Sequence, residues 1–510
     1  MIDPIAFHAR TTPDKIACID LEAGLCFSYR EFDAAVARLA GCLAQRLGPA
    51  SGKRVVMLSK NSATFVMLHY ACARAGAVFT PLNWRLAPPE ISFLVEDSEP
   101  DLIVWESQFD ALVEPSLSRF EPSARFRLEH GRDPLADAAK SAAPLHETLP
   151  KDENAPITLL YTSGTSGRPK GVIISEKSAR YSTLNYALSA CASGESTFLC
   201  DMPLFHVAGL LATTRTPLFF GGTLVISQKF DPKITVERLL DEDLGITHYF
   251  CVTQMAAMMR EYNSPETIKR LSKLTALQTG GAPNPPASVR RWVADGVPMI
   301  DGFGMTEIGS ALSMTPRDLP TIDRKAGSVG LPSMFLEARV VDENGEDVPD
   351  GVVGELWVRG PNVSPGYWRR PEETQKTFGG GWLKSGDAAR RDEDGFYYIV
   401  DRTKDMYISG GENVYPVEVE AAFAELPEIL DCAIVGVPDE KWGEVGVAFI
   451  QLAGEARLDE AGVLAHCRSR LAHYKAPKKV VFVDALPRTP SGKVQKHVLK
   501  ADWLKSEGKA

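Results

Sequence analysis

Helical and strand-like patterns alternate through the first 300 residues, and this alternation constrains the fold more than any other feature of the sequence. SYREFDAAVARLAGCLAQRLG (28–48) predicts a helix, because Ser28 and Glu31 have the spacing of a capping box and Gly48 ends the apolar pattern. The strand-like RVVML (54–58) comes next, followed by the helical NSATFVMLHYACARAG (61–76). Such alternation is typical of parallel sheets covered by helices, so we expect an α/β fold.

Further short apolar runs predict strands at DLIVW (101–105), ITLLY (157–161), TFLCDM (197–202), TLVI (223–226), THYFC (247–251) and VPMID (297–301). Residues 107–155 are rich in Ala, Ser, Pro and Asp, and we expect surface loops there. The pattern changes after residue 325. LEARVVDENGEDVPDGVVGELWVRG (336–360) reads as two strands around turn-rich residues, which is typical of a barrel-like antiparallel region.

A third pattern begins after FYYIVDRTKDMYISGGENVYP (396–416), where the remaining residues predict a small α+β module. PVEVEAAFAEL and DEAGVLAHCRSRL read as helices, and ILDCAIVGV and VGVAFIQLA read as strands. A chain of 510 residues is long enough for at least two domains. We therefore expect an N-terminal domain (1–401) of helix-covered sheets with a barrel-like β subdomain, and a mobile C-terminal cap domain (402–510).

The charge and the cysteines exclude several classes of protein. The net charge is −10, whereas a nucleic-acid binder would present a basic face. The nine cysteines form no CxxC pair and no Cys/His cluster with zinc spacing, so we expect free thiols in a reducing compartment. Because the sequence lacks both a signal-peptide pattern and a run of about 18 apolar residues, we expect a cytoplasmic protein without a membrane span.

The segment YTSGTSGRPKG (161–171) is the most informative part of the sequence. It follows an apolar strand and combines three glycines, four Ser or Thr residues and one lysine. Glycines allow successive backbone N–H groups to point into one concavity, the hydroxyls add donors, and Lys170 adds a positive charge. The Walker A pattern is absent. A Gly/Ser stretch alone would be read as a surface turn, but this composition directly after a strand favours a phosphate-binding loop.

This loop resembles the signature loop of the adenylate-forming superfamily, which includes acyl-CoA synthetases, firefly luciferases and the adenylation domains of peptide synthetases. Further motifs of the superfamily follow in the expected order: PLFH (203–206), GGAP (280–283), DGFGMTE (301–307), SGD (385–387), DRTKDMYISGGEN (401–413) and PRTPSGKVQK (487–496). The resemblance covers nearly the whole chain. It implies an ATP-dependent ligase that converts a carboxylic acid into an acyl-adenylate with release of pyrophosphate and then transfers the acyl group to coenzyme A, using Mg²⁺.

The resemblance also assigns roles in nucleotide binding. The phosphates would be held by Thr162, Ser163, Gly164, Thr165, Ser166, Gly167 and Lys170. Thr306 would donate to the α-phosphate, and Glu307 would be the magnesium-associated carboxylate. Phe303 would stack on adenine, with Gly280, Gly281 and Ala282 at its other face. Asp387 would accept from the ribose hydroxyls. The other nucleotide-binding positions would be Asp301, Gly302, Gly304, Met305, Ile399 and Arg402.

Two half-reactions over one substrate imply two arrangements of the cap domain. In the first, Lys493 would bridge the substrate carboxylate and the α-phosphate as the catalytic lysine. The cap would then rotate about a hinge at Lys404, which would replace Lys493 by a segment that admits coenzyme A. The coenzyme A residues of that segment would be Ser409, Gly410, Gly411 and Glu412. His206 would lie at the junction of the acyl pocket and the thiol path as a gate or orienting group.

The acid itself is less constrained by the sequence. HVAGLL (206–211) contains no acidic residue, so an amino acid substrate is not expected. The acyl pocket would include Val207, Ala208, Leu210, Leu211 and Ile308, and this apolar set favours a medium- or long-chain fatty acid. An aryl acid of the coumarate or ferulate type is the alternative.

Two further functions were weighed. An acyl-AMP ligase that loads a separate carrier protein stays open. A non-catalytic binding protein would be expected to lack Lys170, Glu307 or Lys493, and all three are present. The sequence leaves both a homodimer and peripheral membrane contact open.

Overall fold

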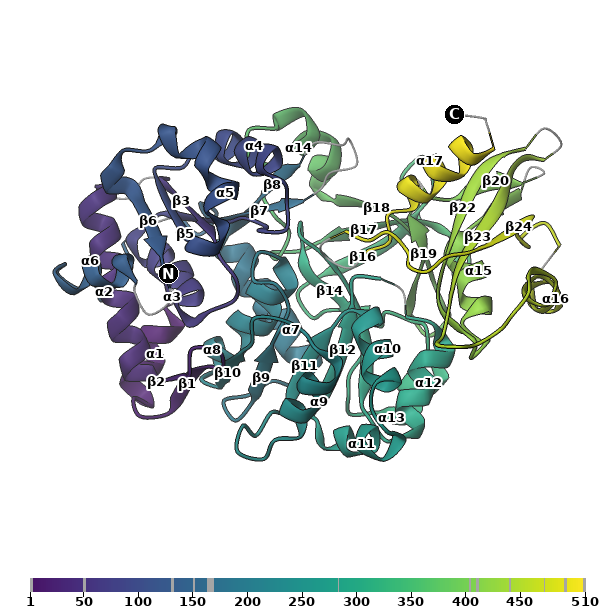
Figure 1. Ribbon diagram of the computed structural model, residues 1–510, viewed down its shortest axis with the longest axis horizontal. Coiled ribbons are helices and arrows are strands. Elements are labelled where there is room, and N and C mark those ends of the chain that lie inside the picture. The colour runs from purple at the N-terminus through teal and green to yellow at the C-terminus, as the bar shows by residue number, and fades with distance from the viewer. Residues whose placement is uncertain are drawn as a thin grey trace.

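The computed structural model describes residues 3–48, 52–129, 133–149, 152–162, 169–282, 284–402, 405–409, 412–439, 442–471, 473–489 and 493–507. These residues form sheets of nine, six, five and four strands with helices packed against them. Figure 1 shows the N-terminal elements (purple and blue) at one end of the long axis and the C-terminal elements (yellow-green) at the other. The predicted α/β fold class, with its barrel-like sheet and small C-terminal module, is confirmed.

The six-stranded sheet has the order β6–β5–β3–β4–β7–β8, and its described pairs are parallel apart from β7–β8. Its strands are β3 (Arg54–Leu58), β4 (Val78–Pro81), β5 (Leu102–Glu106), β6 (Arg125–Leu128), β7 (Pro156–Thr162) and β8 (Lys170–Ser175). Helices α2 (Tyr29–Leu47) and α3 (Ala63–Ala75) pack against each other beside it. The capping box is confirmed, because the Ser28 hydroxyl accepts from the Glu31 N–H and the Glu31 carboxylate accepts from the Ser28 N–H.

The nine-stranded sheet has the order β15–β14–β13–β12–β11–β9–β10–β1–β2, with a parallel centre from β13 to β1. Its strands are β1 (Ile16–Asp20), β2 (Leu25–Ser28), β9 (Thr197–Cys200), β10 (Thr223–Ile226), β11 (His248–Cys251), β12 (Ala276–Gly280), β13 (Met299–Met305), β14 (Gly309–Ser313) and β15 (Leu331–Pro332). Each predicted strand between residues 101 and 301 overlaps an observed one. Parallel strands bring their carboxyl ends to one edge, so residues that follow β9, β11 and β12 meet there.

The four-stranded antiparallel sheet is the barrel-like region that the sequence predicts. It consists of β16 (Glu337–Val341), β17 (Gly354–Arg359), β18 (Leu383–Arg391) and β19 (Tyr397–Arg402). The C-terminal module carries β20 (Tyr407–Ser409), β21 (Glu412–Val414), β22 (Ile429–Asp439), β23 (Gly443–Leu452) and β24 (Lys479–Phe482), with helices α15 (Pro416–Phe423), α16 (Glu460–Arg470) and α17 (Lys496–Ser506). It has its own buried core, which includes Tyr407, Phe423 and Ile450.

The expectation of surface loops over 107–155 is wrong in part. The segment contains β6, which pairs with β5 at the sheet edge and buries Phe126 and Leu128, and the helices α5 (Asp110–Val113) and α6 (Pro134–Lys140). The arginines that alternate with these apolar residues face outward, so the strand is short and half polar. Such an edge strand leaves a weak pattern in the sequence.

The remaining described helices are α1 (Pro4–Thr11), α4 (Pro88–Ser98), α7 (Glu176–Ala190), α8 (Thr216–Phe220), α9 (Pro232–Leu240), α10 (Thr253–Glu261), α11 (Pro265–Lys269), α12 (Pro286–Ala294), α13 (Leu319–Arg324) and α14 (Pro371–Phe378). The short 3₁₀ helices are η1 (Ser107–Phe109), η2 (Glu114–Arg119), η3 (Pro122–Ala124), η5 (Arg270–Lys273) and η6 (Gly379–Gly381). Among all these helices, none is both long enough and apolar enough to cross a lipid bilayer.

A buried ion pair joins two elements of the large domain. The π-helix η4 (Ala208–Arg215) ends at Arg215, whose Nη2 donates to the Glu176 carboxylate at the start of α7, at 3.2 Å. Both side chains are almost fully buried. Each charge therefore depends on the other for solvation, and the pair fixes the end of η4 against α7.

Replacement of Arg215 by methionine should destabilise the N-terminal region by about 3–5 kcal/mol, because the Glu176 charge is left buried without its partner. Urea unfolding followed by tryptophan fluorescence will measure the loss. The double variant Arg215→Met/Glu176→Met removes both charges and should recover most of the stability. A double variant as unstable as the single one would contradict the role of the pair.

Candidate active site

A cavity of about 3150 Å³ lies between the large domain, the four-stranded sheet and the C-terminal module. The residues after β11 and β12, together with β13, form its inner wall, and residues of α15, β22 and the loop before α17 face it from the C-terminal side. Predicted site residues from six separate motifs line this one cavity: Thr162, Lys170, His206, Gly280, Phe303, Thr306, Glu307, Asp387 and Lys493.

One end of the cavity carries a lysine, a tyrosine and a carboxylate. Lys170 Nζ lies 5.4 Å from the ring centroid of Tyr367 and 3.9 Å from Oε1 of Glu373 on α14. The Tyr367 hydroxyl donates to Oε1 of Glu307 at 2.9 Å, and Glu307 is largely buried. The predicted loop residues Ser163, Gly164, Thr165, Ser166 and Gly167 lie outside the described residues. Thr162 and Lys170, which flank them, face the cavity.

The donor set at this end fits a magnesium ion that is held mainly by the nucleotide. Within the described part of the chain, no three His, Cys, Asp or Glu side chains lie close enough together to bind a metal on their own. Mg²⁺ prefers one or two carboxylates together with substrate phosphates and water, and Glu307 is one buried carboxylate beside Lys170. The described residues at this end therefore do not form a metal site from protein ligands alone.

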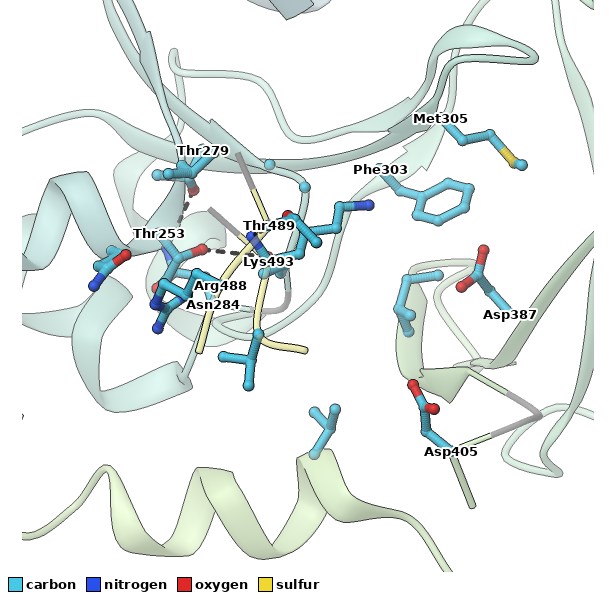
Figure 2. Close-up of a pocket in the computed structure, with 18 of the residues that line it drawn as sticks. Thr253, Thr279, Asn284, Phe303, Met305, Asp387, Asp405, Arg488, Thr489 and Lys493 are labelled. Atoms are coloured by element: carbon cyan, nitrogen blue, oxygen red, sulfur yellow. Dashed lines mark hydrogen bonds between the residues drawn. The ribbon is translucent and has the colours of Figure 1, made fainter. Parts of the chain in front are cut away.

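The end of the cavity where the resemblance places adenosine is built from β12, β13 and β18. Gly280, Gly281, Ala282 and the run Gly302–Met305 line the cavity, as do Asp387 and Ile399. Figure 2 shows Phe303, Met305 and Asp387 on one side of the pocket, with the amine of Lys493 extended toward Phe303. The Asp387 N–H donates to the Ser385 hydroxyl at 3.0 Å, which fixes the turn that presents this buried carboxylate. The side chain of Arg402 lies outside the described residues.

Asp301 does not line the cavity but lies buried behind it. Its Oδ1 accepts from the Thr279 hydroxyl and from the Gly302 N–H, both at 3.1 Å. Burial raises the pKa of Asp301 to about 7. Its contacts join β12 to β13 just where both strands reach the cavity, so Asp301 supports the wall rather than facing a ligand.

Lys493 reaches the cavity from a tight loop of the C-terminal module. The Thr489 N–H donates to the Lys493 carbonyl at 2.7 Å, and the Lys493 N–H donates to the Thr489 hydroxyl at 3.1 Å. Arg488 pairs with Asp431 on β22 and ties the loop to the module's sheet. These contacts hold Lys493 to Thr489 and tie Arg488 to the sheet of the module, and Lys493 lines the cavity from this side.

His206 is half-buried and lines the cavity, and its buried Nε2 has no hydrogen-bond partner among the described residues. Burial first, and then the positive charges of Arg85 and Lys493, lower the pKa of His206 to about 3. The Arg85 guanidinium stacks 4.8 Å from the ring centroid of Trp84. In this arrangement His206 is a neutral imidazole at physiological pH.

The acid pocket differs from the predicted one. Val207 and Ala208 line the cavity, whereas Leu210, Leu211 and Ile308 are fully buried in the core and do not. The side chains that do face the pocket were not predicted: Ser182 and Tyr186 of α7, Ala212 of η4, Phe250 of β11, Gln278 of β12 and Ser310 of β14. Ser182 and Tyr186 have helical i, i+4 spacing, and this was the one signal in the sequence that could have found them.

The predicted coenzyme A segment is described in part. Ser409 is buried in β20, pairs with Gly443 of β23, and does not line the cavity. Gly410, Gly411 and the proposed hinge Lys404 lie outside the described residues, as does the side chain of Glu412. The present arrangement therefore has Lys493, and not Ser409, facing the cavity.

Known proteins resemble this chain over nearly its whole length. Residues 5–368 match the family model of the AMP-binding enzymes, and residues 418–493 match the C-terminal domain model of the same enzymes. The chain is 37% identical to a feruloyl-CoA synthase of Amycolatopsis sp, covering 96% of each chain. It is 33% identical to the long-chain-fatty-acid–CoA ligase FadD13 of Mycobacterium tuberculosis, covering 97% of each. A solved structure of o-succinylbenzoate coenzyme A synthetase from Bacillus subtilis, in complex with ATP and a magnesium ion, has a TM-score of 0.83 at 29% identity, covering 98% of this chain and 99% of that one.

The buried state of His206 predicts a pH-dependent stability. Its folded pKa of about 3 lies below the ordinary value, so below about pH 6.5 the unfolded chain binds a proton that the folded chain does not. Wild-type stability should therefore fall between about pH 6.5 and pH 3, by up to about 1.4 kcal/mol per pH unit from this residue. The variant His206→Phe should lose less stability over this range in thermal unfolding. Parallel pH profiles for the two proteins would contradict the buried, neutral imidazole.

Proposed function

This chain belongs to the family of AMP-binding enzymes, in the acyl-CoA synthetase branch of the adenylate-forming superfamily, and we propose that it joins an aryl acid to coenzyme A in an ATP-dependent reaction. The family confirms the resemblance that the motifs carry. The chain is an ATP-dependent acid–CoA ligase that uses a carboxylic acid, ATP with Mg²⁺, and coenzyme A. The identity of the acid and the roles of the site residues are the content of the proposal.

The first half-reaction joins two anions. An oxygen of the substrate carboxylate attacks the α-phosphorus of ATP, the bond to the β-phosphate oxygen breaks, and pyrophosphate leaves. Lys493 supports this step, because its ammonium group enters the cavity near Phe303, where it can neutralise charge on both reactants (Figure 2). Lys170 and the loop before it hold the leaving phosphates. When bound, Mg²⁺ beside Glu307 withdraws charge from the phosphate oxygens.

The second half-reaction needs a path for a thiol. The sulfur of coenzyme A attacks the acyl carbonyl carbon, the bond to the AMP oxygen breaks, and the thioester and AMP are released. We propose that the cap domain (402–510) rotates on the large domain (1–401) about Lys404, so that Lys493 leaves and Ser409 to Glu412 approach. His206 would remain in place as a neutral group that orients the acyl carbonyl.

The walls of the acid pocket favour an aryl acid over the fatty acid to which the sequence pointed. Three of the five predicted aliphatic positions are in the core, and the pocket instead presents the rings of Tyr186 and Phe250, whose centroids lie 6.4 Å apart. Aromatic walls suit a flat ring better than a flexible chain. Gln278 Oε1 is a buried acceptor without a partner among the described residues, and a long alkyl chain would leave it so.

The feruloyl-CoA synthase of Amycolatopsis is consistent with this choice, because its name assigns it an aryl acid. We also propose a cytoplasmic location, which the nine free cysteines support. The homodimer that the sequence left open stays a prediction.

A pyrophosphate-release screen tests the function. Aryl acids such as cinnamates should give kcat/KM values at least about tenfold above those of medium- and long-chain fatty acids, since unpaired polar groups in the pocket penalise an alkyl chain. Thioester formation should require free coenzyme A. Highest activity with a long-chain fatty acid would refute the aryl assignment, and AMP release independent of coenzyme A would refute the ligase.

The variant Lys493→Ala should slow adenylate formation by about 100-fold or more, because a preorganised cation at the developing charge is lost. Thioester formation from supplied acyl-adenylate should be largely retained, since Lys493 has no part in that step. Single-turnover assays of the two half-reactions separate the effects. The control is Lys505→Ala, at the end of α17 and away from the cavity lining. Equal losses in both half-reactions would mean that the two steps do not use different cap arrangements.

A further inference from the structure

The floor of the acid pocket carries a buried polar atom that the reaction does not use. Gln278 lies on β12, two residues before Gly280, and is only 3% exposed. Its side chain lines the cavity, and its Oε1 is buried without a hydrogen-bond partner among the described residues. A buried carbonyl oxygen without a partner costs about 1–3 kcal/mol. Such an atom at the wall of a binding pocket points to a ligand that donates to it.

The orientation of the Gln278 amide follows from its neighbour. The Ser313 hydroxyl donates its one hydrogen to the Met314 carbonyl at 3.1 Å, so its oxygen can only accept from Gln278. Gln278 Nε2 donates to it at 3.2 Å. A flipped amide could bond to Ser313 only if that hydroxyl turned away from the Met314 carbonyl, at the cost of one hydrogen bond. The nitrogen of Gln278 is therefore directed at Ser313, and Oε1 is the atom left without a partner among the described residues.

The register of the sheet sets the depth of this atom. Phe250 on β11 lies beside Gln278 on β12, so the two residues stand at the same level of the pocket. Gly280, at the end of β12, lines the adenosine side of the cavity. Two residues of strand span roughly 6.6 Å, so Gln278 lies about that far behind the glycine turn. A ring that stacks beside Phe250 would point its far end at Gln278.

We infer that Gln278 is a specificity-determining residue of the acid pocket, and that its Oε1 accepts a hydrogen bond from a hydroxyl group at the distal end of the aryl acid. This inference rests on the proposed function. A neutral amide oxygen accepts from a phenolic hydroxyl, and it offers nothing to a methyl group or to an unsubstituted ring. Oε1 also cannot bind an anionic distal group, because it is an acceptor and such a group has no hydrogen to donate.

The test compares three acids of matched shape: cinnamate, 4-hydroxycinnamate and 4-methylcinnamate. The methyl and hydroxyl groups are nearly the same size, so a difference between them reports hydrogen bonding and not fit. In the wild-type enzyme kcat/KM for coenzyme A-dependent pyrophosphate release should be about 10- to 100-fold higher for the hydroxy acid. The KM for ATP should not depend on which acid is used.

Gln278→Met removes the acceptor and keeps the length of the side chain. The preference for the hydroxy acid over the methyl acid should then fall to within about threefold of unity, with an unchanged KM for ATP. Gln254→Met is the matched control, because Gln254 also lines the cavity but lies on α10. It should keep the wild-type preference. Ser313→Ala, which only frees the Gln278 amide to rotate, should give an intermediate preference.

The outcomes are distinct. Equal wild-type activity with the hydroxy and methyl acids would mean that a water molecule, and not the substrate, satisfies Oε1, and would overturn the inference while leaving an aryl-acid ligase in place. Retention of the preference in Gln278→Met would also overturn it. Failure of all three acids, with a fatty acid accepted instead, would overturn the proposed function together with the inference.

Discussion

The repulsion between a carboxylate and a triphosphate governs the arrangement of this molecule. Both reactants carry negative charge, and in a cavity shielded from water that charge has to be met by groups already in position. The large domain supplies Lys170 and the Glu307–Tyr367 pair on one side. Lys493 comes from a loop of the other module, fixed by Thr489 and by the Arg488–Asp431 pair. A cation on the C-terminal module can be present for one step and absent for the next if the module moves. A cation fixed on the large domain would stay in the site during both steps.

The same cation acts on the neighbouring imidazole. Burial, and then the charges of Arg85 and Lys493, lower the pKa of His206, so the cation proposed to assist adenylation would also help to keep this imidazole neutral. Arg85 belongs to the large domain and would stay when the cap moves.

The contact between β14 and α7 leaves no room for a side chain at position 309. Gly309 has a φ of +63°, and a Cβ there would overlap the Ser182 hydroxyl. A side chain at position 309 would therefore displace α7 from the pocket wall.

The sequence predicts those parts of the molecule that depend on local chemistry. The capping box at Ser28 and the short apolar runs locate helices and strands, and each motif that carries the family resemblance lies where the chain meets the cavity, except for segments outside the described residues. The acid pocket was not predicted correctly, because η4 is a π-helix. The run HVAGLL suggests that its leucines face the ligand, but η4 places Leu210 and Leu211 in the core, and Ala208 and Ala212 line the cavity. Gln278 and Ser313 meet only through sheet pairing, which no local pattern reveals.

Two ends of the acid are thus held by parts of the protein that behave differently during the reaction. Gln278 on β12 and Ser313 on β14 belong to one sheet, with β13 between them, so a distal hydroxyl would be bound equally in both half-reactions. Uniform binding of this kind lowers KM and selects the substrate, but it does not lower the barrier between bound states. In the proposed mechanism Lys493 would act on the reacting end and strengthen its interaction only as charge develops, so it would lower that barrier. Selection among acids and catalysis of their activation can therefore change independently, because the residues responsible lie on opposite walls of the cavity and on different bodies of the fold.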